Sequence, residues 1–200
     1  MITVSNILEV EKYLDGIDAV IFDLDDTLYS EKEYVKSGYR KIAEWLKKPE
    51  VEGLLWKAFE RGGRALDEVL EEKDRATALH IYRFHKPDIH LYPGVKEMLE
   101  RIKLHRKIGI ITDGRPEGQR AKLDALGLNV DYTIITDELG GVEYRKPCAV
   151  AFQKMQRALD VPFERMVYIG DNINKDFIAP SALSMRCIFV KNKEGIYYER

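Results

Sequence analysis

The sequence lacks most features that mark secreted, membrane-spanning or nucleic-acid-binding proteins. Its 200 residues include only two cysteines, Cys148 and Cys187, which are too few for a disulfide framework or a cysteine metal cluster. No apolar run approaches the roughly 20 residues that span a bilayer, and the start has neither the basic nor the apolar region of a signal peptide. With 32 basic and 34 acidic residues, the net charge is −2. We therefore expect a cytoplasmic protein that binds neither nucleic acid nor membrane.

Short apolar runs alternate along the chain with amphipathic helical segments, in a composition that is 45% hydrophobic and 33% charged. This alternation predicts an α/β fold, a Rossmann-like parallel sheet with helices on both faces. In such sheets, ligands bind beyond the carboxyl ends of the strands. Strands are expected at residues 18–23, 107–112, 132–136, 166–170 and 186–190, and helices at 94–104, 117–126, 149–159 and near 175–183.

One interval breaks this rhythm, because residues 30–90 contain no convincing strand. Helices are expected there at 31–46, 51–61, 65–72 and 74–84. The predicted organisation is an α/β core of residues 1–29 and 91–200, with a helical cap of residues 30–90 inserted after the first strand. A further helix, at residues 5–14, is expected to cover the sheet.

Two acidic clusters stand directly after apolar runs. Asp23 and Asp25 follow the first run, and residues two apart on an extended chain share a face, which places the two carboxylates about 7 Å apart. Asp171 and Asp176 follow the run at 166–170. A carboxylate that ends a buried strand is costly to desolvate unless a cation or hydrogen bonds offset the cost. Together the clusters predict a site for a hard cation such as Mg²⁺.

Two more groups fit the same edge of the sheet. Thr112 closes another apolar run and precedes Asp113, so its hydroxyl and the next backbone amides can hold an anionic oxygen. A simple helix-start turn has the same pattern. A positive charge precedes the helix expected at 149–159, and the residues alone do not decide between Lys146 and Arg145.

Taken in order, these residues resemble the four motifs of the haloacid dehalogenase superfamily. The motif DxDxT is residues 23–27, the Thr that closes a strand is Thr112, the Lys-Pro pair is Lys146-Pro147, and GDxxxxD is residues 170–176. The resemblance covers nearly the whole chain, and the helical insertion looks like the C1 cap of subclass I. The chain departs from many relatives at residues 179–185, where Pro180 can kink or delay a helix.

The resemblance implies roles for the acidic residues. Asp23 would be the nucleophile that takes the phosphoryl group as an aspartyl phosphate, and Asp25 the general acid and then the base. Mg²⁺ would be held by the carboxylates of Asp23 and Asp171 and by the backbone carbonyl of Asp25. Asp176 would support the lysine or the water shell of the metal.

The resemblance also implies a phosphate site at Thr112, Asp113 and Lys146. The expected function is Mg²⁺-dependent hydrolysis of a small phosphomonoester, with a small phosphorylated metabolite as the partner of the site. A phosphomutase, a phosphonate hydrolase, a dehalogenase and a catalytically idle binding module remain alternatives on the same frame. In the cap, Tyr34 and Tyr39 are candidates to line the pocket, whereas the two tryptophans are expected to be cap core. No heptad repeat indicates an oligomeric state.

Overall fold

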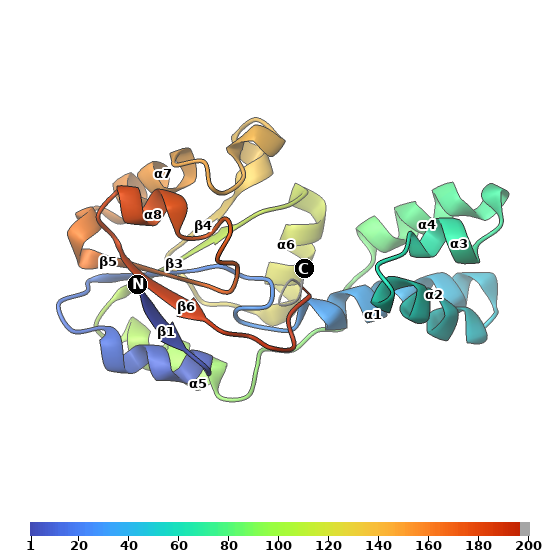
Figure 1. Ribbon diagram of the computed structural model, residues 1–200, viewed down its shortest axis with the longest axis horizontal. Helices are drawn as coiled ribbons and strands as arrows, with labels where there is room; N and C mark the ends of the chain where they lie inside the picture. Colours follow the sequence, from blue (N-terminus) through green and yellow to red (C-terminus); the bar gives the residue numbers. More distant parts are fainter. Residues whose placement is uncertain (197–200) are drawn as a thin grey trace.

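One parallel sheet of six strands forms the centre of the protein, in the order β1-β6-β5-β2-β3-β4 (Figure 1). The computed structural model describes residues 1–196. The predicted α/β fold class is confirmed, because every pairing in this sheet is parallel. The strands are β1 (Ile2–Val4), β2 (Ala19–Phe22), β3 (Lys107–Thr112), β4 (Tyr132–Ile135), β5 (Met166–Gly170) and β6 (Arg186–Val190).

Helices cover both faces of this sheet, because its strands are apolar on both sides. Along β2, Val20 and Phe22 pack toward η1 and α5, whereas Ala19 and Ile21 pack toward α7. This alternation follows from the two-residue period of a strand. In the described part of the chain, no helix has both the length and the apolar character needed to cross a membrane. The helices of the core are η1 (Ile7–Tyr13), α5 (Val95–Lys103), α6 (Pro116–Leu126), η2 (Thr136–Leu139), η3 (Val142–Tyr144), α7 (Val150–Leu159), η4 (Phe163–Arg165) and α8 (Ile178–Ala182).

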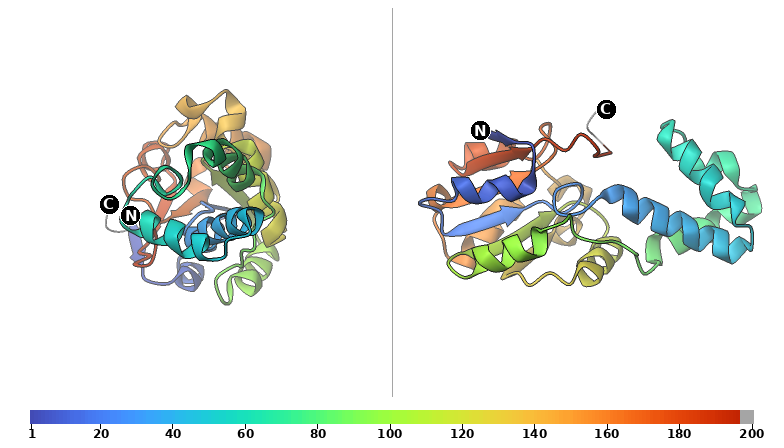
Figure 2. Two further views of the ribbon diagram at one scale, coloured as in Figure 1. Left: turned by 90° about the vertical axis from the view of Figure 1, so that its right-hand side faces the viewer. Right: turned by 90° about the horizontal axis from the view of Figure 1, so that it is seen from below.

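Four helices between β2 and α5 form a separate group, which we call the helical cap and which projects from one end of the core (Figure 2). Its own apolar cluster includes the fully buried Ile42, Leu55 and Ala78. The two connections to the core run side by side, because Tyr29 forms a bridge with Leu91. The cap helices are α1 (Glu31–Leu46), α2 (Glu50–Glu60), α3 (Ala65–Val69) and α4 (Glu72–Phe84).

The strand order explains where a site can form. From β2 the chain builds β3 and β4 on one side, then returns to build β5 and β6 on the other side. At such a reversal the connections diverge and leave a crevice beyond the carboxyl ends of the strands. The cap enters the chain beyond the same end of β2, so it stands beside this crevice.

Several local expectations were wrong. The strand β1 was not predicted, since three residues are too few for a periodic signal, and it pairs with β6 at the sheet edge. The expected helix at 5–14 is the shorter 3-10 helix η1, whose start is capped by the side chain of Asn6. Helix α8 has only five residues, with Pro180 inside it. Trp45 is 40% exposed and so is not cap core, while Trp56 packs only partly against the cap cluster.

Candidate active site

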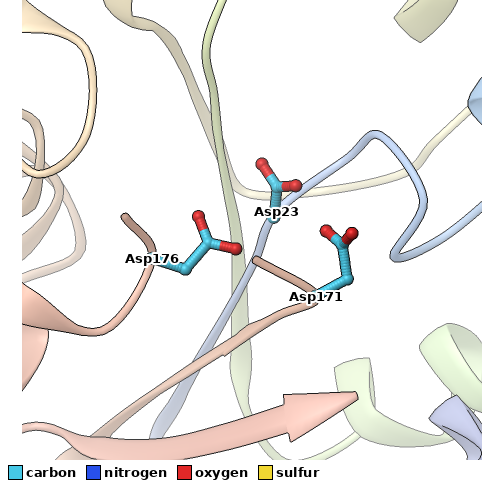
Figure 3. Close-up of side chains that lie close together, drawn as sticks. All are labelled: Asp23, Asp171 and Asp176. Atoms are coloured by element: carbon cyan, nitrogen blue, oxygen red, sulfur yellow. The ribbon is translucent and has the colours of Figure 1, made fainter. Parts of the chain in front are cut away.

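Three aspartates meet at the carboxyl ends of the neighbouring strands β2 and β5 (Figure 3). Asp23 follows β2, and its backbone N–H donates to the carbonyl of Ile169 at 2.8 Å. Asp171 and Asp176 come from the loop after β5. One carboxylate oxygen from each of the three lies within 4.8 Å of the others. The two acidic clusters of the sequence therefore converge on one point.

Burial and crowding make the carboxylates of Asp23 and Asp171 hard to ionise together. Burial raises the pKa of Asp23 to about 7, even though Lys146 acts in the opposite direction. Burial, together with the nearby carboxylates of Asp23 and Asp176, raises the pKa of Asp171 to about 9. A cation bound among them would stabilise the ionised carboxylates against both burial and their mutual repulsion. A set of carboxylate oxygens is also what Mg²⁺ prefers. The residues present thus fit a hard divalent cation.

A fully buried lysine completes this cluster. The Nζ of Lys146 lies 2.5 Å from Asp23 Oδ1 and 2.8 Å from Asp176 Oδ1, and it donates to the hydroxyl of Tyr168 at 2.9 Å. Burial opposes its charge, but the carboxylates of Asp176 and Asp23 outweigh burial and raise the pKa of Lys146 well above its usual range. Arg145 is instead engaged in a two-bond ion pair with Asp137 at 2.6 Å. The positive charge beside Asp23 is therefore the lysine's.

The end of β3 offers a buried hydroxyl next to Asp113, the residue whose carboxylate meets the backbone of Lys146. Thr112 is fully buried, and its Oγ1 has no hydrogen-bond partner among residues 1–196. The carboxylate of Asp113, by contrast, is fully engaged: it accepts from Thr136 Oγ1 at 3.0 Å, from Lys146 N at 3.1 Å and from Lys175 Nζ at 3.0 Å. An unpaired buried hydroxyl is costly unless a ligand supplies its partner. The carboxylate of Asp113 would repel an anion and its carbonyl accepts from Gln119, so only its backbone N–H could donate to an anionic ligand.

Packing in the second acidic motif depends on its glycine. A Cβ at Gly170 would overlap Asp176 Oδ2, so a side chain there would displace the carboxylate that meets Lys146. Asp176 Oδ2 accepts from the nearby backbone N–H of Asn172 at 2.9 Å, and across the sheet edge Thr27 Oγ1, from the loop after β2, donates to Asp171 Oδ1 at 3.2 Å. These bonds fix the directions of two of the three carboxylates.

Asp25 has a different set of partners, which the sequence did not reveal. Lys122 Nζ lies 2.7 Å from Asp25 Oδ1, Gln119 Nε2 donates to Oδ2 at 3.0 Å, and the Tyr29 hydroxyl donates to Oδ1. Burial favours the protonated acid, but Lys122 and these hydrogen bonds outweigh it and hold the pKa of Asp25 below its usual range. Lys122 also lies 4.4 Å from the ring centre of Tyr34 in the cap.

A signal for Lys122 and Gln119 does exist in the sequence. They stand three residues apart on α6, so they share one helix face, and both are buried. A polar pair on the inward face of an amphipathic helix requires a polar partner. Nothing in the spacing, however, identifies Asp25, 97 residues from Lys122, as that partner.

A cavity of about 800 Å³ lies between core and cap, and several of these groups line it. The core contributes Asp23, Asp25, Lys146 and Asp171 to its walls, while Tyr34 comes from the cap. Tyr39, the other candidate, packs in the cap cluster instead, and neither tryptophan is among the lining residues. The cap also contributes Glu31, Leu79, Tyr82, Arg83 and Phe84.

Comparisons with known proteins identify the family of this chain. A family model described as haloacid dehalogenase-like hydrolase matches residues 17–183. A glyceraldehyde 3-phosphate phosphatase of Methanocaldococcus jannaschii is 28% identical, over 90% of this chain and 87% of its own length. The phosphatase of the same name from Methanothermobacter thermautotrophicus is also 28% identical, over 88% and 87%.

Solved structures match in fold. A HAD-superfamily hydrolase of subfamily IA from Geobacter sulfurreducens superposes with a TM-score of 0.67, at 18% identity and with 89% of each chain covered. A HAD-hydrolase of Bacillus subtilis, whose structure contains magnesium, superposes with a TM-score of 0.66, at 20% identity and with 86% of each chain covered.

Proposed function

The chain belongs to the haloacid dehalogenase-like hydrolases, and from this premise we propose that it hydrolyses small phosphomonoesters with Mg²⁺ through an aspartyl phosphate. Family membership and the curated phosphatase relatives identify it as a phosphoric monoester hydrolase. One observation carries the mechanism: the buried Lys146 lies against Asp23 and Asp176, at the sheet edge where β3 ends in Thr112, whose hydroxyl has no partner among the described residues. This is a site for an anion next to a carboxylate that can attack it.

The metal would be held by the carboxylates of Asp23 and Asp171 and by the backbone carbonyl of Asp25. Asp176 is near enough to join through a water molecule, while it holds Lys146 in place. When bound, Mg²⁺ offsets the repulsion between the phosphoryl oxygens and these carboxylates.

The protein's own residues divide the reaction into two steps. Lys146 and Thr112 would bind the phosphoryl oxygens, with the backbone at Asp113 beside them. Asp23 attacks phosphorus, so the Asp23–phosphorus bond forms as the ester P–O bond breaks. Asp25 protonates the departing oxygen. Because, against burial, Lys122 holds the pKa of Asp25 low in the free site, this step requires Asp25 to take up a proton from solvent when the anionic substrate binds beside it. Asp25 then takes a proton from water as that water attacks phosphorus, which frees inorganic phosphate and restores Asp23.

The dehalogenase and phosphonate hydrolase reactions, which the same fold could support, are less well supported here. A halide needs no general acid, whereas Asp25 is held by three side chains. A Schiff-base phosphonate hydrolase needs a cap lysine in the cavity. Among the described residues that line the cavity, the cap supplies Glu31, Tyr34, Leu79, Tyr82, Arg83 and Phe84, none of which is a lysine.

The test is release of inorganic phosphate by the purified protein. The relatives' name places three-carbon phosphates first in the panel, with p-nitrophenyl phosphate as a generic substrate. We expect turnover with Mg²⁺ and none in EDTA. Asp23→Asn should abolish turnover, whereas Asp160→Asn, the same change at an exposed helix end, should not alter it. A phosphomutase would move the phosphoryl group between substrates instead of releasing it.

A further inference from the structure

Among the described residues, one partly buried cation of the cavity, Arg83, has no anionic partner. Arg83, near the end of α4, lines the cavity from the cap side. Its side chain is partly buried, and its Nε is shielded from solvent with no hydrogen-bond partner. Within residues 1–196, no carboxylate forms an ion pair with this guanidinium.

The other buried or half-buried cations of the cavity are matched. Arg115 also lines the cavity, but it is exposed, so water can satisfy its donors. The matched pairs are Lys146 with Asp23 and Asp176, Lys122 with Asp25, Lys175 with Asp113, and Arg145 with Asp137. Arg83 thus differs from its neighbours in combining partial burial with a missing partner.

The chemistry of the guanidinium indicates what that partner is. Arginine stays charged at every relevant pH, and its planar fork matches a carboxylate with two parallel hydrogen bonds. A buried donor without a partner costs free energy, which a ligand can recover by binding to it. Leu79 and Tyr82 of the same helix line the cavity beside Arg83, and their apolar surface excludes water and strengthens a charged contact there.

The position of Arg83 separates this contact from the phosphoryl site. Lys146 and Thr112, which would bind the phosphoryl group, belong to the core, whereas Arg83 belongs to the cap. A substrate whose phosphoryl group lies against Asp23 would therefore present its other end to Arg83. We propose that Arg83 binds a carboxylate at that end, so that the preferred substrates are short phosphorylated hydroxy acids. This inference rests on the proposed phosphatase function and adds a substrate class to it.

A matched series of phosphate esters tests this assignment. The compounds 3-phosphoglycerate, glycerol 3-phosphate and glyceraldehyde 3-phosphate carry the phosphate on the same carbon and differ at the far carbon as acid, alcohol and aldehyde. Phosphoglycolate adds a shorter acid. Hydrolysis of p-nitrophenyl phosphate, which carries no carboxylate, measures turnover without the proposed contact to Arg83. We expect the wild type to have its highest kcat/KM with one of the two acids.

Two substitutions at Arg83 then separate charge from geometry. Arg83→Gln should lower kcat/KM for the preferred acid by about 10- to 100-fold, the range for one lost hydrogen bond to a charged group. The neutral and aryl esters should change by less than about 3-fold. Arg83→Lys keeps the charge but loses the fork, so its loss with the acid should be intermediate. The control is Arg61→Gln, which removes an exposed cap arginine that pairs with Glu68 outside the cavity.

Three results would overturn the assignment while leaving the phosphatase intact. They are an equal loss on all substrates in Arg83→Gln, no loss on the acid, and a wild type that prefers the neutral esters or cleaves neither acid. Absence of Mg²⁺-dependent turnover with every substrate, the aryl ester included, would instead refute the proposed function itself.

Discussion

Mg²⁺ binding should release protons, because the clustered carboxyls of Asp23 and Asp171 are not both ionised at pH 7 without a cation. Burial and the neighbouring carboxylates raise the pKa of Asp171 to about 9, and burial raises that of Asp23 to about 7. At pH 7, a carboxyl with the first value is almost fully protonated and one with the second is half protonated. Binding a cation to both carboxylates should therefore expel between one and two protons.

Calorimetric titration of metal-stripped protein measures this number directly. The heat of Mg²⁺ binding is recorded at pH 7 in two buffers with different heats of ionisation, such as PIPES and Tris, and the difference gives the protons released per ion. Near pH 9.5 the release should fall well below one, since most of the carboxyls are then already ionised. Fewer than about 0.3 protons at pH 7, with Mg²⁺ bound, would refute the reasoning.

The raised pKa of Asp171 also makes the stability of the metal-free protein depend on pH. The folded pKa of Asp171 lies above the ordinary value of 3.8, so the folded state keeps a proton that the unfolded chain has released. Without metal, the free energy of unfolding falls as pH rises between these two values. The gain in Tm at a fixed Mg²⁺ concentration should consequently grow from pH 6 to pH 8. A gain that is constant or declines over this range would contradict the assignment of these carboxylates to the metal.

The remaining predictions concern Asp25 and the cap. Lys122→Met removes the cation that, against burial, holds the pKa of Asp25 below its usual range. The acidic limb of the kcat–pH profile should move up by about one pH unit or more, and an unmoved limb would exclude a role for Lys122. Tyr34→Ala should change the ranking of substrates but spare the aryl ester, as measured by kcat/KM. Tyr39→Ala should instead lower the free energy of unfolding by about 3 kcal/mol in urea, because Tyr39 is buried in the cap cluster. Stability unchanged in Tyr39→Ala would show that the cap core does not depend on it.

Much of the core could be read from the sequence, because its signals are local. Strands β3, β5 and β6 begin and end where their apolar runs do, and those runs are short enough to exclude a buried helix. Helix α1 likewise spans the predicted residues. The edge strand β1 has only three residues and gains its place from pairing with β6, which no local pattern encodes.

The candidate site was predicted as far as its motifs follow strand ends. Asp23, Thr112 and Asp171 all stand at carboxyl ends of neighbouring strands, so the sheet alone brings them together. The choice of Lys146 over Arg145 depends on which side chain is buried beside Asp23, a tertiary fact. Lys122 could not be assigned for the same reason. Its partner is set by how α6 packs against the loop after β2, not by any spacing along the chain.

Trapping the phosphoenzyme tests the central claim most directly. Asp25→Asn keeps the nucleophile but removes the base that activates water, so an intermediate formed from p-nitrophenyl phosphate, whose leaving group needs little protonation, should accumulate. After mixing with Mg²⁺ and the aryl ester and quenching in acid, peptide mass spectrometry should find phosphate on Asp23. The double variant Asp23→Asn with Asp25→Asn should carry none. Phosphate on another residue, or near-normal turnover by Asp23→Asn alone, would contradict the account.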